Sequence, residues 1–172
     1  MKIYYREKSG GIEILRCFGI EGRVEIPGMI DDKLVISAAP YAFSSHMDEK
    51  EDLKNASLWE VSDGLEFGRE EHVLAGNDVE EIVFPYTLKE IGRYIFYGCG
   101  NLKKLEFSDS LMQIGCGAFT GCHALEKLTV HMEQGKKSGV KEMLGEMWQR
   151  IDVNFLYAVS YTHLTLPTIL RV

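Results

Sequence analysis

The feature that most constrains the fold is an internal repeat of 23 residues within residues 79–130. Residues 79–101 and 102–124 align without a gap and are identical at seven positions, whereas average residue usage gives about one or two identities by chance. The identical pairs are Phe84 with Phe107, Leu88 with Leu111, Ile91 with Ile114, Gly92 with Gly115, Phe96 with Phe119, Gly98 with Gly121 and Cys99 with Cys122. A third copy opens with Leu125, Leu128 and Val130. Such a repeat predicts a solenoid, in which each unit buries its apolar side only by stacking on the next.

Each unit is expected to contain a short strand, a turn and a segment that packs back over the strand. Leu105 and Phe107 alternate with polar residues, as in a strand with one buried face. After the turn at residues 85–87 or 108–110, apolar residues follow at i, i+4, i+5 and i+8, the spacing of a short helical or 3₁₀ segment. These are Ile91, Ile95, Phe96 and Cys99 in one copy and Ile114, Ala118, Phe119 and Cys122 in the next. We therefore predict an α/β solenoid with short strands stacked in a curved sheet and short helical or 3₁₀ segments opposite.

The form L-x-x-L-x-F-x-x-x-L-x-x-I-G-x-x-A-F-x-G-C, present in residues 102–122, resembles the BspA-type leucine-rich repeat, which is common in bacterial proteins. The resemblance is close over residues 79–131. It is weaker upstream, where residues 24–27 resemble the strand and residues 40–44 resemble the A-F turn of an irregular first copy. The resemblance implies a curved solenoid that serves adhesion or protein binding, and it carries over no catalytic residue.

The flanking segments are expected to close the solenoid. Two β-rich runs, residues 3–6 and 12–16, surround Ser9-Gly10-Gly11 and predict a hairpin that caps the open edge of the first coil. After the repeats, Val140, Met143, Leu144, Met147, Trp148 and Ile151 form one stripe of an amphipathic helix. Ser138 is the predicted N-cap of this helix. A cap over the last coil and a partner-binding helix both stay open as interpretations, and residues 152–157 are expected to begin another strand.

The predicted organisation has five parts. Residues 1–45 contain the hairpin and a divergent first repeat, and residues 46–78 are an acidic insertion with a short helix at 48–54 and a strand-like stretch at 65–67. Residues 79–131 are the regular repeats, and 132–157 hold the C-terminal capping helix and the start of the next element. We interpret residues 158–172 as a non-native tail, because residues 159–169 resemble a peptide translated from sequencing-adapter DNA at the edge of a fragment. The natural protein is then expected to run on past Ala158.

Charge limits the class of partner. Residues 46–78 hold three basic and ten acidic residues, which equals the whole net charge of −7, and no basic stripe occurs elsewhere. Nucleic acid and anionic lipid are therefore poor candidates, so a protein is the most expected partner and a glycan the second. No apolar run of about 18 residues and no signal-peptide core is present. We expect no membrane insertion and a cytoplasmic location.

The candidate chemical groups are four cysteines, at positions 17, 99, 116 and 122. Cys99 and Cys122 share one repeat position, which favours two small buried hydrophobes, with a disulfide between coils or metal ligation as alternatives. The spacing of Cys116, Cys122 and His123 is not that of a zinc site, and adjacent residues such as Cys122 and His123 tend to point apart. Phosphate-loop, zinc-helix and nucleophile-elbow motifs are missing from the sequence. We expect no cofactor, no metal and no catalysis.

The predicted partner surface follows from alternation along the strands. While Ile82, Phe84, Leu105, Phe107, Leu128 and Val130 turn inward, the residues between them face outward. These outward residues are Glu81, Val83, Lys104, Glu106, Lys127 and Thr129. The predicted function is an interaction module that binds a protein or a glycan through this strand face. The alternatives are a regulatory part of a larger protein whose activity lies beyond residue 158, and an enzyme within these residues.

Overall fold

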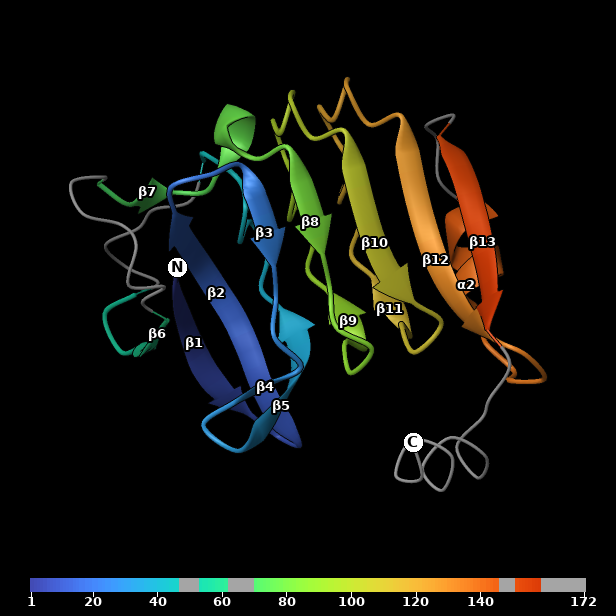
Figure 1. Cartoon of the computed structure of the whole chain (residues 1–172), viewed down its shortest axis with the longest axis horizontal. Coiled ribbons are helices and arrows are strands. Elements are labelled where there is room, and N and C mark those ends of the chain that lie inside the picture. The colour runs from blue at the N-terminus through green and yellow to red at the C-terminus, as the bar shows by residue number, and fades with distance from the viewer. Residues whose placement is uncertain (47–52, 62–69, 146–150, 159–172) are drawn as a thin grey trace, which may run out of the picture.

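The solenoid is built on parallel strands that lie side by side, one from each coil (Figure 1). The computed structural model describes residues 1–46, 53–61, 70–145 and 151–158. Within these residues the sheet contains five strands: β3 (Arg23–Glu25), β8 (Glu81–Val83), β10 (Lys104–Ser108), β12 (Lys127–Glu133) and β13 (Asp152–Ala158). The pairing is in register, so Ile82, Leu105 and Leu128 lie in one row. The predicted strands of the regular repeats are confirmed, and so is the strand expected at residues 152–157.

The return side of each coil contains a second parallel ladder followed by turns. The ladder pairs β5 (Lys33–Ala38), β9 (Glu90–Ile91) and β11 (Gln113–Ile114). In the turns, the amide of Cys99 donates to the Phe96 carbonyl at 3.0 Å, which is an i→i+3 bond. The amide of Phe96 instead donates to the Ala118 carbonyl of the next coil at 3.1 Å. Because alternate amides bond between coils in this way, the predicted helical or 3₁₀ segments form separate turns rather than continuous helices.

Two antiparallel strands at the N-terminus, β1 (Lys2–Lys8) and β2 (Gly11–Gly19), form the predicted hairpin. β2 pairs in parallel with β5, so the hairpin continues the second sheet and covers the first coil at that edge. A smaller hairpin joins β4 (Met29–Ile30) to β5 through Asp31 and Asp32. Both residues have positive φ, 48° and 61°, as a two-residue turn between antiparallel strands favours. The Tyr5 hydroxyl donates to the Asp31 carboxylate and ties this turn to β1.

The acidic segment between the first two coils pairs back onto the N-terminal hairpin. β6 (Ser57–Glu60) joins β1 and β7 (His72–Val73) joins β2, both antiparallel. The coil resumes where the Gly76 amide donates to the Phe43 carbonyl at 2.8 Å. Buried Arg16 fixes the backbone where this segment leaves the first coil, because its Nη1 donates to the carbonyls of Ala42 (3.0 Å) and Ser44 (2.6 Å). Of the predicted helix at 48–54, residues 53 and 54 lie in a turn; the rest of that helix and the stretch at 65–67 lie outside the described residues.

A stack of phenylalanine rings fills the space between the two sheets. The Phe96 ring centroid lies 5.9 Å from that of Phe43 in the first coil and 5.8 Å from that of Phe119 in the third. Phe84, from the strand side, lies 6.2 Å from Phe96. Phe43, in the segment predicted to be the A-F turn of an irregular first copy, stacks on Phe96 as Phe96 does on Phe119. The three rings of Phe43, Phe96 and Phe119 thus join successive coils through one repeated position.

The repeated Ile-Gly pair has a steric cause. A Cβ atom on Gly92 would lie 2.3 Å from the backbone nitrogen of Pro40 in the preceding coil, and one on Gly115 would lie 2.2 Å from that of Arg93. Backbones approach so closely here because the amides of Gly92 and Gly115 donate to carbonyls of the preceding coil, each at 2.8 to 2.9 Å. A side chain at this position would separate the coils, which explains the identity of the two glycines.

Helix is limited in the described residues to η1 (Gly76–Asp78) and α2 (Val140–Gly145). The hydroxyl of Ser138 accepts from the Val140 amide at 3.2 Å, as predicted for the N-cap. Val140 and Leu144 are buried against the last coils, which favours the cap interpretation of the helix, while residues 147 and 148 of the predicted stripe lie outside the described residues. No helix among the described residues is long and apolar enough to cross a membrane.

The phenylalanine stack gives a stability prediction. Phe96→Ala removes the ring that contacts Phe43, Phe84 and Phe119, and truncation of a buried phenylalanine costs about 3–5 kcal/mol. We expect a correspondingly large decrease in the free energy of unfolding, measured by chemical denaturation. Met112→Ala, at an exposed position in the same region, is the control and should change little. Equal midpoints for the two variants would contradict the stack.

Candidate interaction surface

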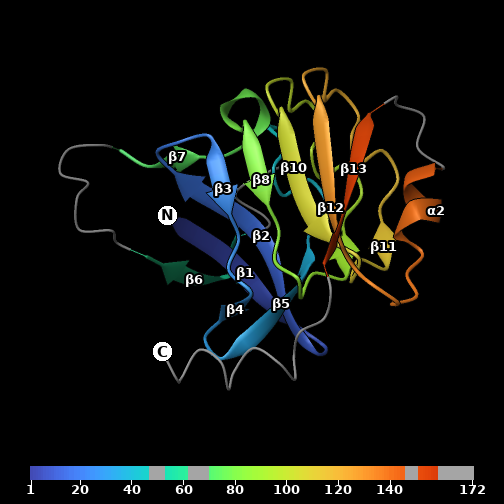
Figure 2. The same ribbon diagram turned by 45° about the vertical axis from the view of Figure 1, so that its right-hand side comes forward.

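The strand face is the outward side of the five-stranded sheet (Figure 2). The register places outward side chains in two rows across the coils. The first row contains Arg23, Glu81, Lys104, Lys127 and Asp152, and the second contains Glu25, Val83, Glu106, Thr129 and Asn154. The side chains predicted to turn inward, Ile82, Phe84, Leu105, Phe107, Leu128 and Val130, are all buried. Of the six predicted surface residues, Glu81, Val83, Lys104, Glu106 and Lys127 are exposed or half-buried, so the alternation is confirmed at these positions.

Thr129 is the exception, and the prediction that its side chain is open to a partner is wrong. Only 3% of the residue is exposed. Glu106 is its lateral neighbour on β10, and His131 follows two residues later on the same face of β12. Glu106 Oε2 lies 2.9 Å from His131 Nε2, so this diagonal pair spans the position of Thr129. Two longer side chains therefore enclose a short one, which alternation along a single strand does not reveal.

A third row lies at the far end of the strands and was not among the predicted surface residues. It contains Ser108, His131 and Leu156, aligned across β10, β12 and β13. The Tyr86 ring, from the turn after β8, lies 5.8 Å from the His131 ring and the residue is 66% exposed. Tyr86 aligns with Asp109 in the next copy, so it stands outside the repeat pattern. The sequence could have indicated Tyr86, because it is an aromatic residue at a turn position that varies between copies.

The charges of the first row are partly neutralised within the molecule. Lys104 Nζ donates to Glu81 Oε1 at 2.6 Å, and this hydrogen bond lowers the pKa of the Glu81 carboxyl below its usual value. Lys127 on the next strand has no carboxylate within 4.0 Å among the described residues. Lys127 is consequently the first-row lysine whose charge is available to an external group.

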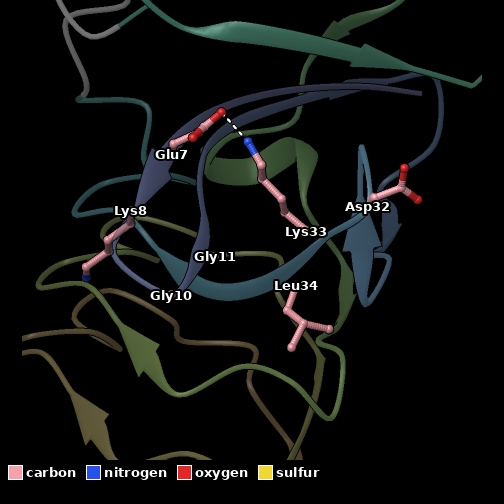
Figure 3. A pocket seen from close by; sticks show the side chains of 7 residues that line it. All are labelled: Glu7, Lys8, Gly10, Gly11, Asp32, Lys33 and Leu34. Carbon is pink, nitrogen blue, oxygen red and sulfur yellow. Dashed lines mark hydrogen bonds and ion pairs between the residues drawn. The ribbon is translucent and has the colours of Figure 1, made fainter.

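The structure also contains a hollow of about 410 Å³ at the tip of the N-terminal hairpin (Figure 3). Its lining includes Lys8, Asp32 and Leu34, together with Glu7 and Lys33. Glu7 and Lys33 form an ion pair with each other, and Figure 3 shows Leu34 directed away from that pair. Binding pockets normally combine apolar walls with a few convergent polar groups, and this hollow lacks that arrangement. Among the described residues, no group of three or more His, Cys, Asp or Glu side chains could hold a metal ion.

A comparison with protein-family models identifies the coils. Residues 70–141 match the family model described as "BspA type Leucine rich repeat region (6 copies)". The regular coils are BspA-type leucine-rich repeats. Among solved structures, the chain is similar to the crystal structure of the T. pallidum leucine rich repeat protein, with 20% sequence identity and a TM-score of 0.37, over 90% of this chain and 80% of that chain. No curated protein matches the sequence.

The family match also bears on function at a coarse level. Leucine-rich repeat proteins are generally interaction modules without catalytic activity, and their stacked strands form an extended surface suited to binding. The five-stranded sheet of this chain provides such a surface, and its outward residues are not required by the core. The family and the sheet together support a repeat-based interaction module.

The two cysteines that share one position of these leucine-rich repeats, Cys99 and Cys122, are buried and free. Cys99 Sγ donates to the Phe43 carbonyl at 3.2 Å, and Cys122 Sγ donates to the Phe96 carbonyl at 3.3 Å, one coil further on. Burial raises the pKa of each of these two thiols to about 12. Neither forms a disulfide, so the interpretation of both as small buried residues is confirmed. Cys17 is also buried and free, whereas Cys116 is exposed.

This distribution predicts the reaction of the thiols with an alkylating or disulfide reagent. At pH 7–8 we expect one fast thiol per chain, Cys116, because the other three lack both access and thiolate character. Titration of native protein with a chromogenic disulfide reagent measures the number of reactive thiols. In unfolded protein all four cysteines should react. Cys116→Ser should abolish the fast phase. Rapid labelling of Cys99 or Cys122 in the native state would contradict the burial of the repeat cysteines.

Proposed function

We propose that this protein is an interaction module that binds another protein through the strand face of its leucine-rich repeats. The observation that carries the proposal is the mixed chemistry of the three outward rows on a rigid sheet. Lys127 offers a charge with no ion-pair partner among the described residues, Tyr86 an exposed ring and Leu156 an exposed apolar side chain. Protein interfaces combine aromatic anchors with a polar rim in this way.

Two features of the face favour a protein over a glycan. Tyrosine is enriched among the residues that dominate protein–protein binding energy, and Tyr86 packs beside the His131 ring, which limits its freedom before binding. The face is also a broad sheet, whereas small sugars are normally enclosed by a concave site. A glycan is the second candidate, because the same mixture of an aromatic ring, hydroxyl groups and charges also suits sugar hydroxyls. A regulatory role within a larger protein fits the same surface. Catalysis by the described residues is not part of the proposal.

The test compares charge reversals on the two sides of the coil. Lys127→Glu places an acidic group in the first row, while Lys89→Glu makes the same change at an exposed position on the return side. Exposed substitutions typically change stability by less than about 0.5 kcal/mol, so both variants should fold. We expect Lys127→Glu, combined with Tyr86→Ala, to weaken partner binding at least about tenfold, a change of about 1.4 kcal/mol. Lys89→Glu should leave affinity unchanged.

The partner for this measurement is obtained by cross-linking to the wild-type chain and is then purified, and the dissociation constant is measured by titration calorimetry. Lys104→Glu is less suitable alone, because it would place a second carboxylate beside Glu81 and disturb an internal pair. If the strand-face variants bind as tightly as wild type while substitutions in residues 46–78 abolish binding, the acidic segment is the binding site and the proposal fails. Binding to a glycan array, lost in the same strand-face variants, would assign the second candidate.

A further inference from the structure

Tyr86, Glu106 and His131 form a cluster at the carboxyl ends of the parallel strands, to which three successive coils each contribute one residue (Figure 1). The Tyr86 ring centroid lies 5.8 Å from that of His131, and Glu106 Oε2 lies 2.9 Å from His131 Nε2. Ser108 lies on the intervening strand, beside His131 in the register, and is buried. Because His131 contacts both neighbours, the exposed Tyr86 ring and the Glu106 carboxylate are positioned before a partner binds.

The contact with Glu106 determines which nitrogen of the neutral His131 ring carries the hydrogen. An ionised carboxylate only accepts hydrogen bonds, so Nε2 is the donor to Glu106 and Nδ1 keeps a lone pair. Among the described residues no group donates to Nδ1, and this atom is not buried. His131 therefore presents a hydrogen-bond acceptor to solvent beside the Tyr86 ring.

The charges around this acceptor are acidic. Besides Glu106, the strand β12 contributes Glu133, which follows His131 on the same face, is exposed and has no ion-pair partner within the described residues. The carboxylate of Asp109, on the turn after β10, is neutralised by Lys136 Nζ at 2.8 Å. The residue of β13 that is aligned with His131 is apolar. Charge complementarity therefore favours a group that carries positive charge and donates hydrogen bonds.

We propose that Tyr86, Glu106 and His131 form a subsite for an arginine side chain of the partner protein. The guanidinium donates to His131 Nδ1 and pairs with the Glu106 carboxylate, while its planar face lies on the exposed Tyr86 ring. Arginine fits better than lysine, because its planar group has several donors in fixed directions and stacks on aromatic rings. The subsite lies on the strand face, so it rests on the proposed function and deepens it by assigning one residue of the partner.

Protonation of His131 should weaken the binding of arginine. An imidazole gains its second proton within the range from pH 8 to pH 5, which converts Nδ1 from an acceptor into a donor and adds a positive charge. Arginine thus binds the uncharged ring, and its affinity should be high at pH 8 and fall as the pH decreases through this range. A carboxylate in the same place would show the opposite trend. His131→Gln supplies a neutral amide with an acceptor oxygen and should remove this pH dependence.

The test titrates the full chain with N-acetyl-arginine methylamide and, as a matched uncharged probe, N-acetyl-citrulline methylamide at equal ionic strength. The NMR signals of the His131 and Tyr86 rings report binding. We expect a dissociation constant on the order of 10 mM for the arginine probe at pH 8. Binding should be at least about fivefold weaker at pH 5.5, and the citrulline probe should give no saturable shift.

Matched variants locate the charge that the probe recognises. Glu106→Gln keeps an acceptor for His131 but removes the negative charge, and should weaken binding of the arginine probe about threefold. Tyr86→Leu keeps an apolar side chain but removes the ring, and should have an effect of about the same size. Glu126→Gln makes the same change as Glu106→Gln at an exposed acid just before β12, outside the cluster, and should leave the affinity unchanged.

Four results would overturn the subsite: no saturable shift with the arginine probe up to about 100 mM, equal shifts with both probes, affinity that rises as the pH falls, or equal losses in Glu106→Gln and Glu126→Gln. The proposed function is tested separately with the partner. If the probe fails while Lys127→Glu with Tyr86→Ala still weakens partner binding, the strand face is the binding site without this subsite. If the probe binds as expected but those variants bind the partner as tightly as wild type, the arginine subsite stands and the proposed function fails.

Discussion

The structure depends on hydrogen bonding between successive coil backbones, whose paired strand residues are 23 positions apart. On the strand side, the amide of Lys104 donates to the Glu80 carbonyl, and the amide of Lys127 donates to that of Lys103 one coil later. On the return side, the amide of Gly115 donates to the Ile91 carbonyl of the preceding coil. Because both sides of each coil are tied to the same neighbour, an insertion of one residue within a coil would break one of the two ladders. The number of residues in each coil is therefore as constrained as their types.

The constraint explains which positions are identical in the repeat. Glycine recurs where a Cβ would meet the neighbouring backbone, phenylalanine where a ring must fill the gap between the sheets, and cysteine where a small side chain caps a carbonyl of the previous coil. These roles are all inward or between coils, so they could be predicted from one sequence by alignment with itself. The details that the sequence does not show lie where the neighbouring coil decides the outcome. The apolar spacing in residues 91–99 suits a helix, but alternate amides bond to the next coil and leave single turns.

At the surface, the sequence predicted the direction of side chains along one strand but not the contacts between strands. Alternation along one strand assigned the outward side of Glu81, Lys104 and Lys127, because each side-chain direction is fixed by the backbone. It did not show that the pair of Glu106 and His131 would enclose Thr129, since that contact joins different strands diagonally. The pairing of β6 and β7 with the hairpin was likewise invisible, because short antiparallel partners carry no repeat signal and residues 57–60 and 72–73 offered little pattern.

A solenoid separates the residues that hold it together from those that meet a partner, and this separation has a physical origin. Substitution of an inward residue such as Phe107 changes the packing of at least two coils, whereas substitution of Lys127 changes only the outer row. Binding residues can therefore vary without loss of the fold. The hairpin that covers the first coil belongs to the other sheet, so it does not disturb the strand face.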